Sequence, residues 1–314
     1  MMKRLQGSLI LSITAIIWGT SFVLQKIGMN YMEPFTYGAA RFLIGGVILL
    51  PIILLFSVLA KKRAKNQARA KLKSKKQTKD LYFGGILCGC ALFLGASSQQ
   101  WGITTTTAGK AGFITALYIV LVPLFGIFMK KRISLLTGLG VGLAVIGLYL
   151  LMVKEGFMVQ VGDAFVLFGT VFWALHIVVV DIFAEKTDGL KLSFIQFITA
   201  GLLSTFAAIV FEHPKVEMLV SSAILIIFTA GVIVGVAYTL QVIGQKYTSP
   251  TVAAIILSLE AVFAVISGAV FLGEAMSTRE LIGCLFMFVA VIITQVKPQK
   301  IYRYLKKPSA LHRN

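Results

Sequence analysis

The chain contains ten apolar segments of helix length, and they form two groups of five. The segments lie at residues 8–30, 35–60, 81–101, 108–129, 134–153, 163–184, 191–211, 219–241, 250–272 and 280–296. A helix needs about 20 apolar residues to cross a bilayer, so each segment is long enough to do so. These runs are continuously apolar, whereas the strands of a membrane barrel alternate over about 10 residues. The sequence therefore predicts an all-α integral membrane protein with ten transmembrane helices.

The composition agrees with a membrane location. Apolar residues make up 58% of the chain and charged residues only 13%. A soluble domain with this composition would leave much of its hydrocarbon exposed to water. The first segment is too long for a signal peptide and lacks a small-residue cleavage site, so we expect it to be retained.

The basic residues are concentrated in the connections on one side of the ten-helix arrangement. The chain has 30 Lys and Arg against 12 Asp and Glu, a formal net charge of +18. By the positive-inside rule, this distribution predicts a multi-pass protein of the plasma (inner) membrane with both termini cytoplasmic. Residues 61–80 form a basic cytoplasmic loop, and residues 298–314 form a basic cytoplasmic tail. We expect anionic lipid headgroups to bind the loop, with RNA or a protein partner as the alternative, and no nucleic-acid function for the protein as a whole.

Two residue offsets relate the first group of segments to the second. Trp18 and Trp173 lie 155 residues apart in the first segment of each group. Beyond the second segment of each group the offset is 143, as for Thr105 and Thr248. Because five is an odd number, the second group enters the membrane from the opposite side. The pattern predicts two inverted five-helix repeats, an arrangement in which secondary transporters place the substrate site between the repeats.

Three stretches of the sequence resemble the EamA-like branch of the drug/metabolite transporter superfamily. They are Trp18-Gly19-Thr20-Ser21-Phe22 with Lys26, Pro34-Phe35 followed by Arg41-Phe42, and Ser258-Leu259-Glu260 through Leu272-Gly273-Glu274. The chain departs from the family pattern at Ala261, where the family commonly has Pro. It also departs at Lys130-Lys131, which is the first-half counterpart of Gly273-Glu274.

The resemblance covers nearly the whole chain and implies a ten-helix carrier with a central cavity. Residues 1–155 then form the first EamA-like five-helix repeat, which includes the loop 61–80, and residues 156–297 form the second. Many members of this family export amino acids or other small metabolites. The resemblance implies a secondary transporter that moves a small organic metabolite, such as an amino acid or related compound, across the plasma membrane by alternating access.

Two other classes of function are the alternatives. One is an intramembrane enzyme acting on a lipid-linked intermediate, and the other is a non-transporting sensor or a channel on the same fold. No HExxH, paired-carboxylate or Ser/His/Asp pattern favours an enzyme, so we expect none. No cofactor or metal is expected, because Cys88, Cys90 and Cys284 lie in apolar segments without the spacing of a metal or redox motif. The sequence carries no signal for an oligomeric state.

Two ionisable residues lie deep in apolar segments and are candidate coupling residues. Glu260 lies about 18 Å into the ninth segment at 1.5 Å per residue, so it must be protonated or paired. It is a candidate proton-coupling site or cation ligand, with an interhelical hydrogen bond as the structural alternative. His176 lies one helical turn from Trp173, so the two side chains share a face. It could relay protons or bind solute, or it could simply bond to a neighbouring helix.

The candidate cavity residues combine aromatic rings with polar groups. Trp18 and Trp173 lie too deep for the interfacial aromatic belt. They could form the walls of a cavity for an amphipathic or cationic solute, or they could pack in the core. The predicted substrate-cavity residues are Trp18, Gln99, Gln100, Tyr118, Trp173, His176, Gln241 and Glu260.

Four further charged residues are candidate gate or coupling residues. Lys26, near the outer end of the first segment, has Asp181 as its repeat counterpart near the inner end of the sixth. Opposite charges at opposite mouths suggest gate contacts, with surface anchoring as the alternative. Arg41 and Lys110 lie one or two turns below the outer surface. They could snorkel to water, pair with Glu33 or attract an anionic solute.

Overall fold

The structure is a computed structural model that describes residues 2–65, 75–106, 108–130, 133–152, 160–272 and 277–295, and the regular structure in these residues is entirely helical. The helices are α1 (Met2–Gly28), α2 (Pro34–Lys65), α3 (Lys75–Thr105), α4 (Ala108–Ala116), α5 (Tyr118–Phe128), α6 (Leu135–Met152), α7 (Val161–Ala184), α8 (Gly189–Phe211), α9 (Val216–Ser221), α10 (Ala223–Phe228), the π-helix η1 (Thr229–Tyr238), α11 (Thr239–Gln245), α12 (Pro250–Leu257), α13 (Glu260–Leu272) and α14 (Thr278–Gln295). The prediction of an all-helical fold is confirmed.

Within the described residues, eight helical stretches are long and apolar enough to cross a membrane. Two shorter apolar helices, Leu135–Leu150 and Leu281–Thr294, lie at the predicted fifth and tenth segments. Large apolar side chains point outward from several helices, including Leu54 at 63% exposure and Ile224 at 87%. So much exposed hydrocarbon is stable only when lipid covers it. The chain is a multi-pass membrane protein, and the exact number of ten crossings stays a prediction.

Two of the predicted segments are broken in the middle. Residues 108–129 divide into α4 and α5 at Leu117, and residues 250–272 divide into α12 and α13 at Ser258 and Leu259. At both breaks a backbone N–H bonds to the carbonyl three residues back, from Leu117 to Ile114 and from Leu259 to Ile256, each at 3.2 Å. Such bonds tighten the helical turn and change its direction. The offset of 143 places Leu117 opposite Glu260, so the two breaks lie within two residues of each other in the two halves.

The segment predicted at residues 219–241 is also irregular. It contains the ten-residue π-helix η1, between α10 and α11. π-Helices are rare and are often found at functional sites. The segment packs closely on α2, because a Cβ on Gly45 would lie 2.5 Å from Val234. Tyr238, the last residue of η1, is buried in the centre of the protein.

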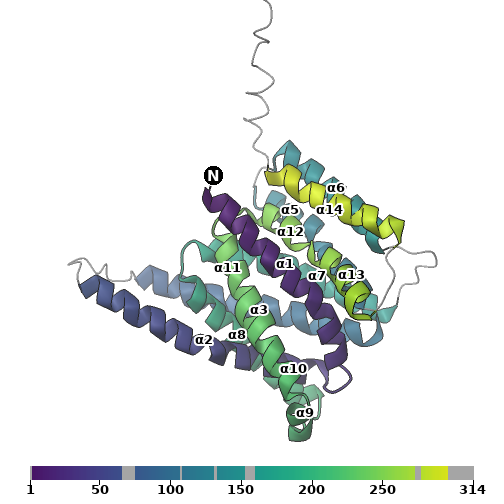
Figure 1. The fold of residues 1–314 in the computed structure, drawn as a ribbon. Helices are drawn as coiled ribbons and strands as arrows, with labels where there is room; N and C mark the ends of the chain where they lie inside the picture. Colours follow the sequence, from purple (N-terminus) through teal and green to yellow (C-terminus); the bar gives the residue numbers. More distant parts are fainter. Residues whose placement is uncertain are drawn as a thin grey trace, which may run out of the picture.

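Helices of the first half pack against helices of the second half throughout the structure. α2 packs against α8 and α6 against α14, and both pairs are visible in Figure 1. Between them, α3 packs along α7, α1 packs along η1 and α11, and α1 also packs against α12 and α13. The main buried cluster contains residues from both halves, including Trp18, Tyr118, Trp173 and Tyr238. The centre of the protein is therefore an interface between the two halves.

The predicted basic loop is more helical than expected. α2 continues to Lys65 and α3 begins at Lys75, so both described ends of residues 61–80 are helical. Lys, Arg, Ala and Gln dominate this stretch and are good helix formers, which explains the extension. The rest of the loop, residues 66–74, and the predicted tail at 298–314 lie outside the described residues.

Candidate functional site

A small cavity lies at the interface between the two halves. The space open to the centres of water molecules inside it is about 30 Å³, and one water needs about 10–15 Å³ on this measure. The cavity is therefore closed around a volume too small for an organic metabolite. Its lining residues are Trp18, Ser21, Phe22, Gln25, Arg41, Gln99, Thr115, Tyr118, Trp173, Ile177, Ile233, Tyr238, Gln241 and Glu260.

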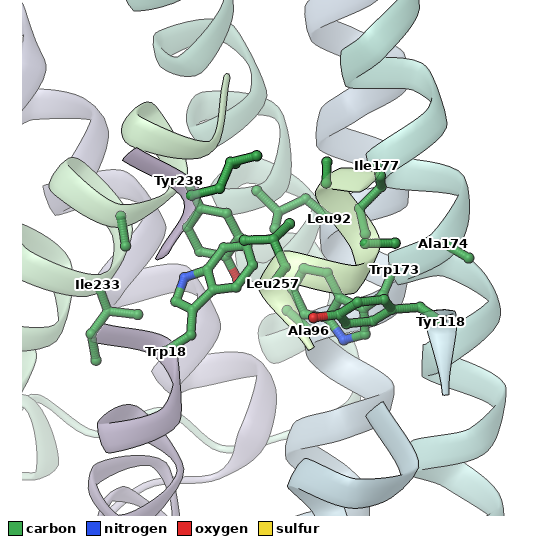
Figure 2. Close-up of a cluster of buried hydrophobic side chains, with 14 of the residues drawn as sticks. Trp18, Leu92, Ala96, Tyr118, Trp173, Ala174, Ile177, Ile233, Tyr238 and Leu257 are labelled. Carbon is green, nitrogen blue, oxygen red and sulfur yellow. The ribbon is translucent and has the colours of Figure 1, made fainter. Parts of the chain in front are cut away.

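Three aromatic rings form one wall of the cavity. The ring centroid of Tyr238 lies 4.8 Å from that of Trp18 and 6.0 Å from that of Trp173, which is nearly parallel to it at 13°. Figure 2 shows Trp18 beside Tyr238, with Trp173 and Tyr118 nearby. Gly95 provides the space for Trp173, because a Cβ there would lie 3.1 Å from the indole. The two tryptophans from equivalent positions thus meet on one tyrosine.

A chain of hydrogen-bonded amides forms a second wall. The Gln99 Oε1 atom accepts hydrogen bonds from Trp173 Nε1 at 2.9 Å and from Thr115 Oγ1 at 3.2 Å. Gln99 Nε2 in turn donates to Gln25 Oε1 at 3.1 Å, and Gln25 Nε2 donates to Ser21 Oγ at 3.0 Å. The network connects α1, α3, α4 and α7. Its members are fixed by one another, and they position the Trp173 ring.

Other polar atoms on the cavity wall have no hydrogen-bond partner among the described residues. They are Trp18 Nε1, Arg41 Nε and Gln241 Oε1, whereas Tyr118 Oη and the Glu260 carboxyl group lie next to each other. The large majority of buried side-chain polar atoms in proteins are hydrogen-bonded, so several unsatisfied atoms around one cavity call for an explanation. A pocket in which a few polar groups converge is the usual form of a small-molecule site.

Arg41 and Glu260 place a basic and an acidic group on this cavity. Arg41 is 2% exposed and Glu260 is 3% exposed, and neither forms an ion pair with another described residue. The guanidinium of Arg41 lies 4.8 Å from the ring centroid of Tyr37. Tyr238 lies within electrostatic range of both groups. A buried charge without a partner is costly, so its presence here favours a role in binding.

The break between α12 and α13 positions Glu260. The carboxylate belongs to the first residue of α13, where negative charge is favoured by the helix dipole. Tyr118, the first residue of α5, stands beside the equivalent break and lies close to Glu260. Ala261, which replaces the family's common Pro, donates its N–H to Ser258 at 3.1 Å. A proline would lack this donor.

The structure brings six of the eight predicted cavity residues to the cavity wall. These six are Trp18, Gln99, Tyr118, Trp173, Gln241 and Glu260. Gln100 lies next to the cavity and donates to the Gln25 carbonyl at 3.1 Å. His176 lies behind the aromatic wall, where its ring is perpendicular to Trp173 and Tyr238, and its Nε2 atom bonds to Gln196 at 2.9 Å. The role of all eight residues in transport stays a prediction.

Three of the predicted gate residues, Lys26, Lys110 and Asp181, do not line the cavity. Lys26 Nζ contacts the carbonyl oxygens of Ile103 and Thr106 at the end of α3, at 2.6 and 3.1 Å. Lys110 pairs with Asp163 at 2.8 Å. Asp181 is half-buried near the opposite end of α7.

Of the three alternatives for Arg41, snorkelling to water does not fit the structure, because the side chain is buried and lines the cavity. A pairing of Arg41 with Glu33 is likewise absent among the described residues, where Glu33 instead accepts a hydrogen bond from the His213 backbone.

Several lining residues were missed, although helical spacing could have found most of them. Ser21, Phe22 and Gln25 follow Trp18 at the i+3, i+4 and i+7 positions, which share its face of α1. Ile177 follows Trp173 at i+4 in the same way. Ile233 and Tyr238 are five residues apart, a spacing that aligns them only in the π-helix. No sequence signal marked that helix.

The amide network supplies a first prediction about stability. Gln99→Leu removes the acceptor for Trp173 Nε1 and the donor to Gln25, and an unsatisfied buried group costs about 1–3 kcal/mol. We expect this variant to unfold several degrees below the unmodified protein in detergent. Gln100→Leu is the matched control, since it removes a single bond. Equal unfolding temperatures for the two variants would show that the network does not stabilise the cavity.

A helical multi-pass protein with a closed polar cavity between two halves has the form of a membrane transporter. The model of the EamA-like transporter family matches residues 5–153 and 160–296. An uncharacterized transporter of Archaeoglobus fulgidus is 32% identical over 301 residues, which cover 94% of this chain and 87% of that one. The uncharacterized transporter YvbV of Bacillus subtilis is 23% identical over 316 residues, covering 94% and 93%.

The chain belongs to the EamA-like transporter family and is a membrane transporter. A crystal structure has the same fold, with a TM-score of 0.70, 20% sequence identity and coverage of 96% of this chain and 98% of that one.

Proposed function

We propose that this transporter is a secondary carrier that moves a small organic metabolite, such as an amino acid or a related compound, by alternating access. The observation that carries this proposal is the closed cavity between the halves, with three polar atoms on its wall that have no partner among the described residues. A cavity that can hold a solute only when it enlarges is expected of a carrier between two open states. Binding energy from the unpartnered atoms would then favour closure around the solute.

Ten membrane crossings in two inverted repeats, at residues 1–155 and 156–297, are part of this proposal. α6 and α14 would be the fifth crossing of each repeat. The contact of α3 with α7 has its counterpart in the contact of α11 with α1. The breaks at Leu117 and at Ser258–Leu259 also lie within two residues of each other at the offset of 143. Discontinuous helices at the repeat interface are typical of the substrate sites of secondary transporters.

The buried basic and acidic groups favour a dipolar solute, whose ammonium group would stabilise the ionised form of Glu260. The planar guanidinium of Arg41 suits a carboxylate, which it can bind through two parallel hydrogen bonds. Glu260 suits an ammonium group. The rings of Trp18, Trp173 and Tyr238 suit an apolar side chain and add cation–π attraction. We infer that a zwitterion with a short apolar side chain contacts Arg41, Glu260 and the aromatic rings together, whereas an anion or a cation leaves one of the two ionisable groups without a partner.

The orientation follows from the basic residues. We infer that both termini are cytoplasmic and that the membrane is the plasma membrane, because this places most Lys and Arg on the inner side. The basic residues at the ends of α2 and α3 would then face anionic headgroups.

A thermal-shift screen of the purified transporter tests the substrate class. A bound solute stabilises the folded state in proportion to its occupancy. We expect one or more apolar amino acids to raise the unfolding temperature by a few degrees. The methyl ester and the N-acetyl derivative of the same amino acid are matched controls, and each is expected to give no shift. A sugar or nucleoside that shifts the transition when no amino acid does would contradict the dipolar assignment.

A further inference from the structure

Several glycine pairs bring helix backbones into direct contact, and two of them are Gly7–Gly244 and Gly102–Gly162. In α1 and α11, a Cβ on Gly7 would lie 2.8 Å from the Gly244 carbonyl oxygen. In α3 and α7, a Cβ on Gly162 would lie 2.5 Å from the Gly102 carbonyl oxygen. Neither position accepts a side chain without movement of a helix. Small residues permit such close approach between membrane helices.

The two contacts are built from equivalent residues of the two halves. Gly7 and Gly162 are 155 residues apart, the same offset as Trp18 and Trp173. Leu11 and Val166 are also 155 residues apart and Thr105 and Thr248 are 143 apart, whereas Gly102 and Gly244 are 142 apart, one residue short of that offset. Leu11 packs on Gly244 as Val166 packs on Gly102, and Thr248 faces Gly7 as Thr105 faces Gly162. A similar helix contact is therefore formed twice, once between α1 and α11 and once between α7 and α3.

The two contacts lie at opposite ends of the protein, on either side of the cavity. Gly7 is near the start of α1, whereas the other end of α1 carries Lys26, which bonds to the end of α3 close to Gly102. Trp18 is eleven residues beyond Gly7, and Trp173 is eleven residues beyond Gly162. At 1.5 Å per residue, each contact stands about 17 Å from the aromatic wall.

One of the two ends carries an additional polar connection. Asp163, next to Gly162, accepts from Lys110 Nζ at 2.8 Å and from the Thr106 hydroxyl. The counterpart of Asp163 at the other end is Ser8, which carries no charge and cannot form an ion pair. Among the described residues, Lys110–Asp163 is the one ion pair. We call the end with the Gly102–Gly162 contact the Asp163 end, and the end with the Gly7–Gly244 contact the Gly7 end.

We propose that the Gly102–Gly162 and Gly7–Gly244 contacts are the two gates of the transport pathway, and that the Asp163 ion pair locks only the first. This inference rests on the proposed alternating-access function. Two helices that meet at glycines can separate and come together again without side chains having to repack. Such a contact suits a gate that opens once in every transport cycle. In the closed structure both contacts are formed. Transport then requires each to separate while the other stays closed.

Side-specific cysteine labelling tests the gates directly. The reporter is Ser21→Cys on the cavity wall, in a protein whose Cys88, Cys90 and Cys284 are replaced by Ala. A membrane-impermeant thiol reagent is applied to intact cells and to inverted vesicles. Gly162→Val is expected to raise labelling from the Asp163 end at least tenfold and to lower it from the Gly7 end. Gly7→Val is expected to do the reverse.

Gly142→Val is the matched control, because a Cβ on Gly142 meets nothing within 4 Å, and it should leave both labelling rates unchanged. If the valine variants do not fold, Gly162→Ala and Gly7→Ala give the same comparison with a smaller wedge. Asp163→Asn should raise labelling from the Asp163 end alone.

Unchanged labelling in the glycine variants, or increased labelling from the same side in both, would overturn the gate assignment. Solute flux is measured in parallel. Labelling that changes sides in a protein that moves no solute would preserve the gates and contradict the proposed function, whereas normal flux with unresponsive labelling would contradict the gates alone.

Discussion

Arg41→Gln is expected to weaken solute binding by about 100-fold, because truncating one partner of a buried charged pair costs about 2–5 kcal/mol. The folded protein should remain at least as stable as before. Arg41 is buried without an ion-pair partner among the described residues, and removing an uncompensated charge relieves a desolvation cost. Lower affinity with an equal or higher unfolding temperature would distinguish a binding residue from a structural one.

Two further variants complete the Arg41 experiment. Arg41→Lys keeps the charge but loses the planar pair of donors, so we expect an intermediate affinity. Arg4→Gln is the matched control, since Arg4 bonds to the Thr294 carbonyl away from the cavity and should not affect solute binding. If Arg41→Gln binds the solute as tightly as the unmodified protein, the anionic group does not bind at Arg41.

Glu260→Gln is expected to abolish concentrative transport while the protein stays folded. The amide has nearly the same shape as the carboxylate, but it carries no charge to bind an ammonium group or a proton. Losing a hydrogen bond to a charged group costs about 1.5–3 kcal/mol, or roughly a tenfold to 100-fold loss of affinity. Uptake into proteoliposomes is measured with and without a proton gradient. Unchanged proton dependence in this variant would remove Glu260 from coupling.

Glu212→Gln is the matched control, because it should lower stability without changing solute binding. Glu212 accepts hydrogen bonds from the backbone N–H groups of Phe35 and Thr36 at 2.7 Å, which caps the start of α2. Weakening this cap should lower the unfolding temperature and leave solute affinity intact. Glu260→Gln and Glu212→Gln therefore separate a carboxylate that binds solute from one that holds a helix. A loss of stability in both, with equal loss of transport, would indicate that Glu260 is structural.

Much of the helical arrangement could be predicted from the sequence, because the bilayer requires long apolar helices and the chain marks their ends with charges and turn formers. The predicted segments and observed helices differ mainly at their ends. The breaks within segments were not predictable in this way. Pro123 lies inside α5 without ending it, while the actual break is at Leu117. The packing of neighbouring helices decides where such a break falls.

The candidate site was partly predictable, since residue type and depth indicate which polar groups lie away from water. Trp18 and Trp173 were expected at equivalent positions, and they meet on Tyr238. For Arg41 the sequence left three alternatives open, because it indicated the depth of the residue but not the rotation of α2 that directs its side chain to the cavity. His176 shares a helical face with Trp173 and still lies outside the cavity wall. Helical periodicity predicts which residues share a face of a helix. The structure is needed to show whether that face lies against the cavity, another helix or lipid.

The most direct test of the central claim is counterflow in proteoliposomes loaded with an apolar amino acid that shifts the thermal transition. A carrier with one alternately exposed site exchanges solute across the membrane, so internal unlabelled solute should accelerate the entry of labelled solute several-fold. The account predicts this acceleration in the unmodified protein and its loss in Arg41→Gln. Entry that is independent of internal solute would indicate a channel, and the absence of entry would contradict transport of a dipolar solute through this cavity.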